Sequence, residues 1–238
     1  MSPERQPVYI IYLKKRTKKG GKFNMSGAAE KILELLINLL VLFMAFPVHE
    51  FAHAYAADKL GDHTARYEGR LTLNPKAHID IMGAICMILV GFGWAKPVPV
   101  NPMKFQKVSP KVGMAITSFA GPLSNLIMAY IAMIIYKILC FTIGYGTVAW
   151  IFAYMVLLNV GLAVFNLLPI PPLDGSRIAT LFMKEQTYFK IMQYEKYIFI
   201  ALIAVVYSGV LDTPLNWLQI RVLNIMDFLT GYIDMIFA

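Results

Sequence analysis

Long apolar runs separated by short polar stretches dominate this chain of 238 residues. Residues 31–57, 112–142 and 147–168 are largely apolar, and each run is long enough to cross a bilayer as a helix, which needs about 20 residues. Two further apolar runs, 195–211 and 215–237, follow near the C-terminus. The pattern therefore predicts an all-α polytopic membrane protein with three long spans and about two additional C-terminal transmembrane helices.

One apolar run does not fit this scheme as well as the others. Residues 79–95 are apolar but contain Gly83, Gly91 and Gly93, and their number is at the short limit for a span. A re-entrant segment, which enters and leaves the membrane on the same side, competes with a complete crossing. Both interpretations stay open, and we use the re-entrant one to derive the topology.

The amino-acid composition agrees with a membrane location. Hydrophobic residues make up 58% of the chain and charged residues only 15%, whereas soluble domains carry about 25% charged residues. The polar stretches 58–78, 96–111 and 176–194 fall on one side of the membrane if 79–95 is re-entrant. Because lysine and arginine mark cytoplasmic loops, these stretches are predicted to be cytoplasmic. They contain Lys59, Arg66, Arg70, Lys76, Lys96, Lys104, Lys107, Lys111, Arg177, Lys184 and Lys190.

The N-terminal tail holds most of the net charge of +8. Residues 1–24 contain seven lysines and arginines against Glu4 alone, a net charge of +6. No nucleic-acid-binding motif accompanies this tail, so we expect lipid headgroups or water around it rather than nucleic acid. The topology places the tail outside the cell, against the charge rule. A biological start at Met25 would remove this conflict and make the tail dispensable or disordered.

The first long helix contains a motif with metal-binding chemistry. In His49-Glu50-x-x-His53 the two imidazoles lie one helical turn apart on the same face. This spacing lets both bind one zinc ion, with the glutamate placed as a general base. Such polar groups are costly in a membrane helix, so a function is expected there. We predict His49 and His53 as metal ligands and Glu50 as a catalytic residue.

A catalytic zinc needs a third protein ligand, and the candidates are His63, Glu68, His78 and Asp174. The first three lie in a polar stretch, where solvated side chains are the ordinary expectation. Asp174 instead follows a proline-rich turn, 169–172, at the cytoplasmic end of its span, which is the membrane depth of the histidine motif. Capping of the following helix is the alternative role for Asp174, but the shared depth favours metal ligation.

Asn125, inside the second span, is a candidate for stabilising the oxyanion that forms during peptide hydrolysis. Its side-chain amide can donate a hydrogen bond to a developing negative charge. The alternative is an interhelical hydrogen bond between packed spans, which contributes about 1 kcal/mol. The residue pattern does not decide between the two roles.

Five motifs together resemble the site-2 protease family of intramembrane zinc metalloproteases, in particular its short prokaryotic branch. They follow the family's order between residues 40 and 180. The motifs are His49-Glu50-Phe51-Ala52-His53-Ala54, Gly69-Arg70-Leu71-Thr72-Leu73-Asn74-Pro75, Gly93-Trp94-Ala95-Lys96-Pro97-Val98-Pro99-Val100-Asn101, Gly121-Pro122-Leu123-Ser124-Asn125, and Asn166-Leu167-Leu168-Pro169-Ile170-Pro171-Pro172-Leu173-Asp174-Gly175. The resemblance implies a three-helix catalytic core with a re-entrant or β-like segment after the first helix. It also implies a zinc ion bound by His49, His53 and Asp174, with Glu50 as the catalytic acid and base.

The resemblance also implies an activity and a setting. We expect a single membrane-embedded protease domain over 25–238, with a catalytic core at 31–180 and extra helices at 195–237. Its substrates would be single-span membrane proteins, cut within or near the cell membrane, with the active site toward the cytoplasm and lipid around the helices. The alternative is a catalytically silent membrane scaffold or metal-binding protein of the same fold. A transporter is disfavoured because the chain has no inverted repeat.

Overall fold

The computed structural model describes residues 27–83, 86, 95–144 and 146–237. In this part of the chain every regular element is a helix, and the β-type pairing consists of one isolated antiparallel bridge between Ile79 and Ala95. A mostly helical fold is thus confirmed for the described residues. The tail 1–24, the start at Met25 and most of 79–95 lie outside them, so the re-entrant segment stays a prediction.

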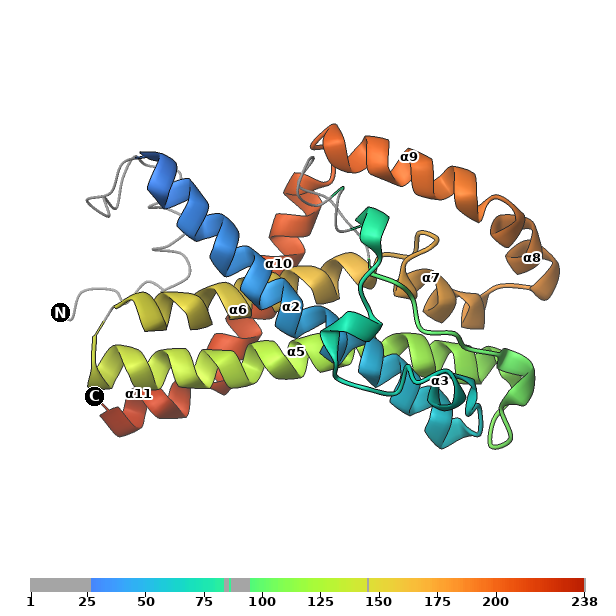
Figure 1. The fold of residues 1–238 in the computed structure, drawn as a ribbon, viewed down its shortest axis with the longest axis horizontal. Helices are drawn as coiled ribbons and strands as arrows, with labels where there is room; N and C mark the ends of the chain where they lie inside the picture. Colours follow the sequence, from blue (N-terminus) through green and yellow to red (C-terminus); the bar gives the residue numbers. More distant parts are fainter. Residues whose placement is uncertain (1–26, 84–85, 87–94, 145, 238) are drawn as a thin grey trace.

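Three long helices build the centre of the molecule. They are α2 (Gly27–Leu60), α5 (Pro110–Thr142) and α6 (Thr147–Asn166). Figure 1 shows α5 and α6 side by side, with α2 crossing over them. By length and composition, α5 and α6 could each cross a membrane. α2 continues through Pro47 without a break, so the histidine motif lies on a continuous helix.

Short helices occupy the polar stretches between the long ones. α3 (Thr64–Tyr67), η1 (Pro75–Ala77) and η2 (Pro102–Lys104) lie between α2 and α5, and α7 (Asp174–Ala179), η3 (Thr180–Phe182) and α8 (Glu185–Gln193) follow α6. These stretches share one end of the molecule in Figure 1. The Lys111 ammonium donates to the Met183 carbonyl at 2.7 Å, which joins the start of α5 to the stretch after α6.

The C-terminal region differs from the two separate spans expected over 195–211 and 215–237. It forms α9 (Glu195–Tyr207), α10 (Asp212–Leu229) and α11 (Gly231–Phe237). α9 and α10 together are long enough for one span, but they meet at an angle of 85°. Gly209 adopts a positive φ of 72° between them, a conformation that glycine allows without steric cost. The described residues thus contain two candidate spans, or three if this bent pair is one span.

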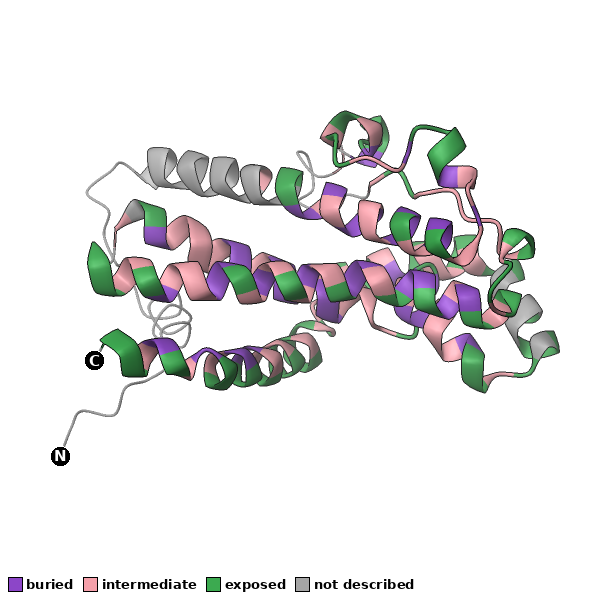
Figure 2. Cartoon of the chain, turned by 90° about the horizontal axis from the view of Figure 1, so that it is seen from below, coloured by how far each residue is buried: buried purple, intermediate pink, exposed green. Residues whose placement is uncertain are grey.

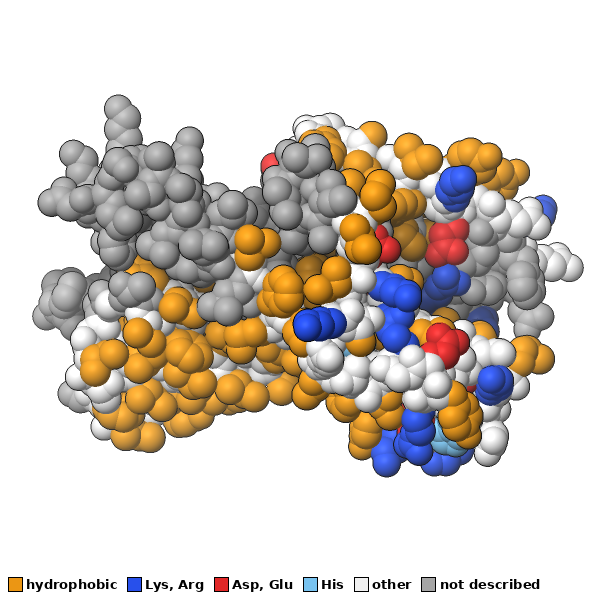
Figure 3. Space-filling model, in the orientation of Figure 1, with side chains coloured by type: hydrophobic (Ala, Val, Ile, Leu, Met, Phe, Trp, Pro, Cys, Tyr) orange, Lys and Arg blue, Asp and Glu red, His pale blue; other side chains and the backbone are white. Residues whose placement is uncertain are grey.

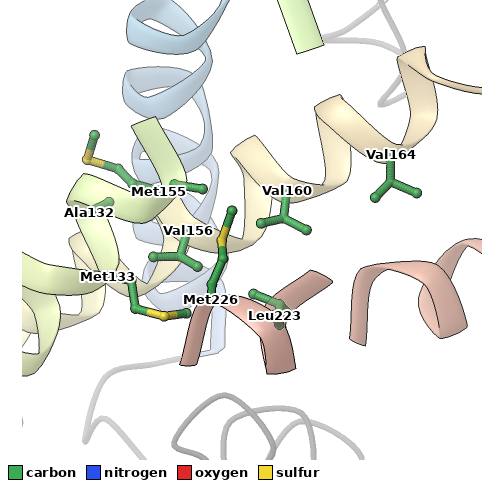
Figure 4. Packing of buried hydrophobic residues seen from close by; sticks show 9 residues of the cluster. Ala132, Met133, Met155, Val156, Val160, Val164, Leu223 and Met226 are labelled. Atoms are coloured by element: carbon green, nitrogen blue, oxygen red, sulfur yellow. The ribbon is translucent and has the colours of Figure 1, made fainter. Parts of the chain in front are cut away.

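A buried apolar cluster fixes α10 against α5 and α6. Figure 4 shows its side chains pointing toward one another from the three helices. The cluster consists of Ala129, Ala132, Met133, Met155, Val156, Val160, Val164, Leu223 and Met226. Figure 2 shows that buried residues gather where the long helices face one another, while their outer faces are exposed. Since the outer faces of α5 and α6 are also apolar, they suit a lipid environment.

A charged cluster ties the C-terminal helices to α5 at Lys137, one turn beyond Met133 of the apolar cluster. The buried Lys137 ammonium lies 2.9 Å from Asp227 Oδ1 in α10 and 2.7 Å from Asp234 Oδ2 in α11. A charge buried in this way is stable only when it is paired. The cluster therefore holds α10 and α11 in place, at the end of α5 remote from the histidine motif.

Candidate metal centre

His49, His53 and Asp174 come together at the crossing of α2 with the turn after α6. The Nε2 atoms of the two histidines are 3.0 Å apart. Asp174 Oδ2 lies 3.2 Å from the first and 3.3 Å from the second. Ligands about 2.0–2.1 Å from a tetrahedral zinc would be about 3.3 Å from each other. The three donor atoms therefore have the spacing that one zinc ion requires, and among the described residues they form the one such group.

The outer nitrogens of both imidazoles are held by α5. His53 Nδ1 donates to the Thr117 carbonyl oxygen at 2.7 Å, and His49 Nδ1 lies 3.0 Å from Asn125 Oδ1. A carbonyl oxygen only accepts hydrogen bonds, so His53 carries its proton on Nδ1 and presents a lone pair on Nε2. Paired with Asn125 Oδ1, His49 does the same. Two lone pairs and a carboxylate oxygen that converge at about 3 Å fit a cation between them.

Asp174 reaches this point because the chain turns sharply after α6. α7 begins at Asp174 itself, and its N-cap is Leu173, which makes no side-chain capping bond. The carboxylate therefore faces the histidines, which is the geometry expected of a ligand rather than of a helix cap. At Gly175 a Cβ atom would lie 2.1 Å from the Leu167 carbonyl oxygen, so this tight turn requires glycine.

α5 approaches the two imidazoles most closely at Gly121. A Cβ atom there would lie 2.4 Å from His53 Nε2 and 2.7 Å from His49 Cε1, closer than van der Waals contact permits. The sequence offered a signal for this role, since Gly121-Pro122 is unusual within an apolar span. The spacing of the histidine motif alone did not show that α5 would approach the imidazoles at Gly121.

Glu50, which lies between the two histidines, is 8% exposed. Its Oε2 accepts a hydrogen bond of 3.0 Å from the backbone N–H of Val98. The proline-rich stretch 96–101 thus touches the predicted catalytic carboxylate, a contact that the motifs did not predict because 48 positions separate the two residues.

Asn125 is fully buried and bridges α2 and α5 through its bond to His49. The interhelical hydrogen bond considered from the sequence is therefore present. Its Nδ2 has no hydrogen-bond partner among the described residues. A buried amide donor without a partner is costly, so the oxyanion role remains compatible with this geometry and stays a prediction.

The other candidates for the third ligand do not join the metal group. His63 Nδ1 is 2.7 Å from Asp58 Oδ1, His78 Nε2 donates to the Thr72 carbonyl at 2.8 Å, and Glu68 is exposed. Glu68 is solvated as the sequence analysis expected, and His63 is partly so. His78 is only 2% exposed, so the expectation of a solvated side chain is wrong for it: the hydrogen bond to the Thr72 carbonyl holds its ring inside the fold.

Comparison with known proteins places this chain in a family. The model of peptidase family M50 matches residues 142–208, which include Asp174 but not the histidine motif. The "Putative zinc metalloprotease YwhC" of Bacillus subtilis strain 168 is 43% identical over 169 residues, which cover 68% of this chain and 76% of that protein. The chain belongs to peptidase family M50, the site-2 protease family. The resemblance inferred from the five motifs is thereby confirmed.

Other M50 relatives match at lower identity. The "Putative zinc metalloprotease MJ0611" of Methanocaldococcus jannaschii is 32% identical over 150 residues, covering 62% of this chain and 71% of that protein. The "Putative zinc metalloprotease Rip2" of Mycolicibacterium smegmatis is 35% identical over 141 residues, covering 56% of this chain and 51% of the relative. No solved structure matches the chain significantly.

Proposed function

We propose that this M50 chain is an intramembrane zinc endopeptidase that cleaves single-span membrane proteins within or near the membrane. The observation that carries the proposal is the convergence of His49, His53 and Asp174 beside the buried Glu50. His49, Glu50 and His53 lie on the long, largely apolar helix α2. Asp174 follows the candidate span α6, and the relatives' names specify zinc. A membrane peptidase combines all three features. We propose that residues 25–238 form its single domain.

The residues have separate roles in this proposal. His49, His53 and Asp174 would hold the ion, which when bound would lower the pKa of a water molecule to about 7 and supply a Lewis acid for the substrate carbonyl. Glu50 accepts a proton from the attacking water and transfers it to the leaving amine. Asn125 Nδ2, free of other partners among the described residues, donates to the oxyanion. The His49 bond to its Oδ1 holds the amide in the orientation that this donation needs.

The proposed topology puts the metal site toward the cytoplasm. Figure 3 shows lysine and arginine side chains gathered over the end of the molecule that carries α3, while the described surface away from this end is mostly apolar. By the charge rule for membrane proteins, a basic end of this kind supports a cytoplasmic location. A reporter fused after Lys107 should therefore give a cytoplasmic signal in intact cells, and an external signal would refute this orientation.

A catalytically silent scaffold remains the alternative function. Such a protein would need the ligands but not a base. Glu50 is buried next to the two histidines and is held by a hydrogen bond, an arrangement that costs desolvation and gives a scaffold no benefit. The base therefore favours catalysis. Neither function requires nucleic acid, and lipid is the expected surrounding of α5 and α6.

The proposal is tested with purified protein and a single-span substrate in detergent or liposomes. Cleavage should stop when a chelator removes the metal and return when zinc is added. Asp174→Ala should bind less than one tenth of the wild-type zinc, since it removes one of three ligands. Cleavage that continues in metal-free protein would refute the zinc mechanism, and undiminished zinc in Asp174→Ala would exclude this residue as a ligand.

A further inference from the structure

The stretch 96–101, which we name the strap, lies along the second half of α2. Its start is held by Lys96, whose N–H donates to the His78 carbonyl at 2.9 Å. Its end is held by the Asn101 N–H, which donates to Asp62 Oδ2 at 2.6 Å. Between these two anchors the Val98 N–H donates to Glu50 Oε2. The strap thus reaches the predicted general base from a fixed position at both ends.

The composition of the strap restricts it to this arrangement. Pro97 and Pro99 have no N–H group, so the Val98 N–H is the only donor between Lys96 and Val100. A residue before proline is confined to extended conformations, and both Lys96 and Val98 precede one. The strap is therefore stiff, and its single central donor is aimed at the Glu50 carboxylate.

Arg70 anchors the strap in an unusual way. Its side chain is buried, with the residue 7% exposed, and its Nη2 donates to the Lys96 carbonyl at 2.7 Å. Among the described residues no carboxylate pairs with this guanidinium, and its Nε has no hydrogen-bond partner. Burying such a charge is costly. We therefore expect the Arg70 guanidinium to have a role that requires a long, planar hydrogen-bond donor. That role is to fix the Lys96 carbonyl, two residues before Val98.

Asp62 secures the other end of the strap. It is fully buried, and it accepts from the Asn101 N–H and from the Thr64 N–H at 3.1 Å. The Leu60 carbonyl, at the end of α2, accepts from the Gln106 N–H at 3.0 Å. These bonds tie the chain beyond the strap to the same helix that carries Glu50, so the register between strap and helix is set.

We propose that the strap positions the general base, with the Val98 N–H as the donor that orients the Glu50 carboxylate and Arg70 as the anchor of that donor. The inference rests on the proposed peptidase function and adds two positioning residues to it. A glutamate side chain has three rotatable bonds, and a fixed donor on Oε2 selects the rotamer in which Oε1 is free for the water. Val98 and Arg70 act through Glu50 and touch neither zinc nor substrate.

The first experiment replaces the donor. Val98→Pro removes the N–H and keeps an extended backbone, while the matched control Val98→Ala keeps the N–H and shortens the side chain. We expect kcat to fall about 10–100-fold in Val98→Pro, with KM and bound zinc unchanged, and Val98→Ala to resemble wild type. Unchanged kcat in Val98→Pro, or a loss of zinc that accounts for the loss of activity, would overturn the proposal.

The second experiment tests the anchor. Arg70→Gln should lower kcat by a similar factor without loss of zinc. Because both residues act through the same carboxylate, the double variant with Val98→Pro should be no slower than Val98→Pro alone. Independent losses that multiply in the double variant would show that Arg70 does not act through the strap.

A readout without activity covers the case in which Val98→Pro does not fold. The amide hydrogen of Val98 should exchange more slowly with deuterated solvent in wild type than in Glu50→Ala, because the carboxylate protects it. Equal exchange rates would refute the contact. The function itself is tested separately. If Glu50→Gln cleaves as well as wild type, the peptidase proposal fails. If Glu50→Gln is inactive but Val98→Pro keeps the wild-type kcat, the strap proposal fails and the peptidase proposal stands.

Discussion

His49 Nδ1 and Asn125 Oδ1 lie 3.0 Å apart and join α2 to α5 at the metal centre. The two residues are 76 positions apart in the chain. Oδ1 is occupied by the histidine, whereas Nδ2 has no partner among the described residues and is the group to which we assign the proposed oxyanion contact. One buried side chain can therefore orient a ligand and donate to the oxyanion, and the two roles can be separated by substitution.

Asn125→Leu should weaken zinc binding about 10–100-fold, because His49 loses the acceptor that fixes its tautomer and ring orientation. Asn125→Asp keeps an acceptor at this position and should retain zinc, but it loses the amide donor and should lower kcat about 100–1,000-fold. Zinc competition titrations and single-turnover cleavage measure the two effects. Asn159→Leu is the matched control, since Asn159 is also buried but bonds to the Met155 carbonyl of its own helix. Full activity in Asn125→Asp would exclude the oxyanion role.

Gly121→Ala should abolish zinc binding, although alanine favours a helix by about 1 kcal/mol over glycine. The added Cβ would occupy space 2.4 Å from His53 Nε2 and push the imidazole away from the metal position. Gly161→Ala in α6 is the control, because its Cβ would meet its nearest neighbour, Gln219 Nε2, at an ordinary 3.5 Å. The zinc content of the purified variants measures this effect. A Gly121→Ala protein that still binds zinc would contradict the prediction, because it would show that α2 and α5 can move apart.

The sequence predicted that His49, His53 and Asp174 come together, because each of them had its own signal in the chain. His49 and His53 follow from helical spacing, and Asp174 follows from a proline turn at a shared membrane depth. The supporting contacts of Thr117 and Val98 have no such signature. Each depends on which residues of another segment come close in the folded chain, and a carbonyl or an N–H is present at almost every position.

The C-terminal helices also depend on contacts that the sequence pattern does not reveal. Hydropathy located the apolar residues of 195–237 but not the 85° bend between α9 and α10, because the angle depends on packing. α10 turns to place Leu223 and Met226 against α6 and to bring Asp227 to Lys137.

Lys137→Met should destabilise the docking of α10 and α11 by about 2 kcal/mol. Removing one partner of a fully buried pair costs about 3–5 kcal/mol, and this cluster should cost less because the side chains of Asp227 and Asp234 are 34% and 39% exposed. Limited proteolysis should then cut the C-terminal region faster, with zinc content unchanged. A triple variant that also carries Asp227→Asn and Asp234→Asn should recover part of the loss; equal proteolysis of wild type and Lys137→Met would contradict this role.

The stability of the polar end of α2 should depend on pH through Asp58. Burial disfavours the charged carboxylate, but the hydrogen bond from His63 and the charge of Arg66 outweigh it, so the pKa of Asp58 lies below its usual 3.8. A carboxyl group with a lowered pKa stabilises the fold at pH values above its unfolded-state pKa. This stabilisation is lost as the pH falls through its folded-state pKa.

Asp58→Asn should therefore lower the free energy of unfolding by about 1 kcal/mol at pH 7. The difference from wild type should shrink as the pH falls from the ordinary aspartate pKa of 3.8 through the lower folded-state pKa of Asp58, where the native carboxylate also becomes protonated. Thermal unfolding in detergent across a pH series measures it, with the exposed Glu68→Gln as control. A difference that stays constant with pH would show that the charge of Asp58 is not involved.

The most direct test of the peptidase account compares wild type with Glu50→Gln on the same single-span substrate. The substitution keeps size and shape and removes only the base, so Glu50→Gln should bind one zinc per chain like wild type. Its cleavage rate should fall at least about 100-fold, the lower end of what a general base contributes. Equal cleavage by the two zinc-loaded proteins would contradict the account.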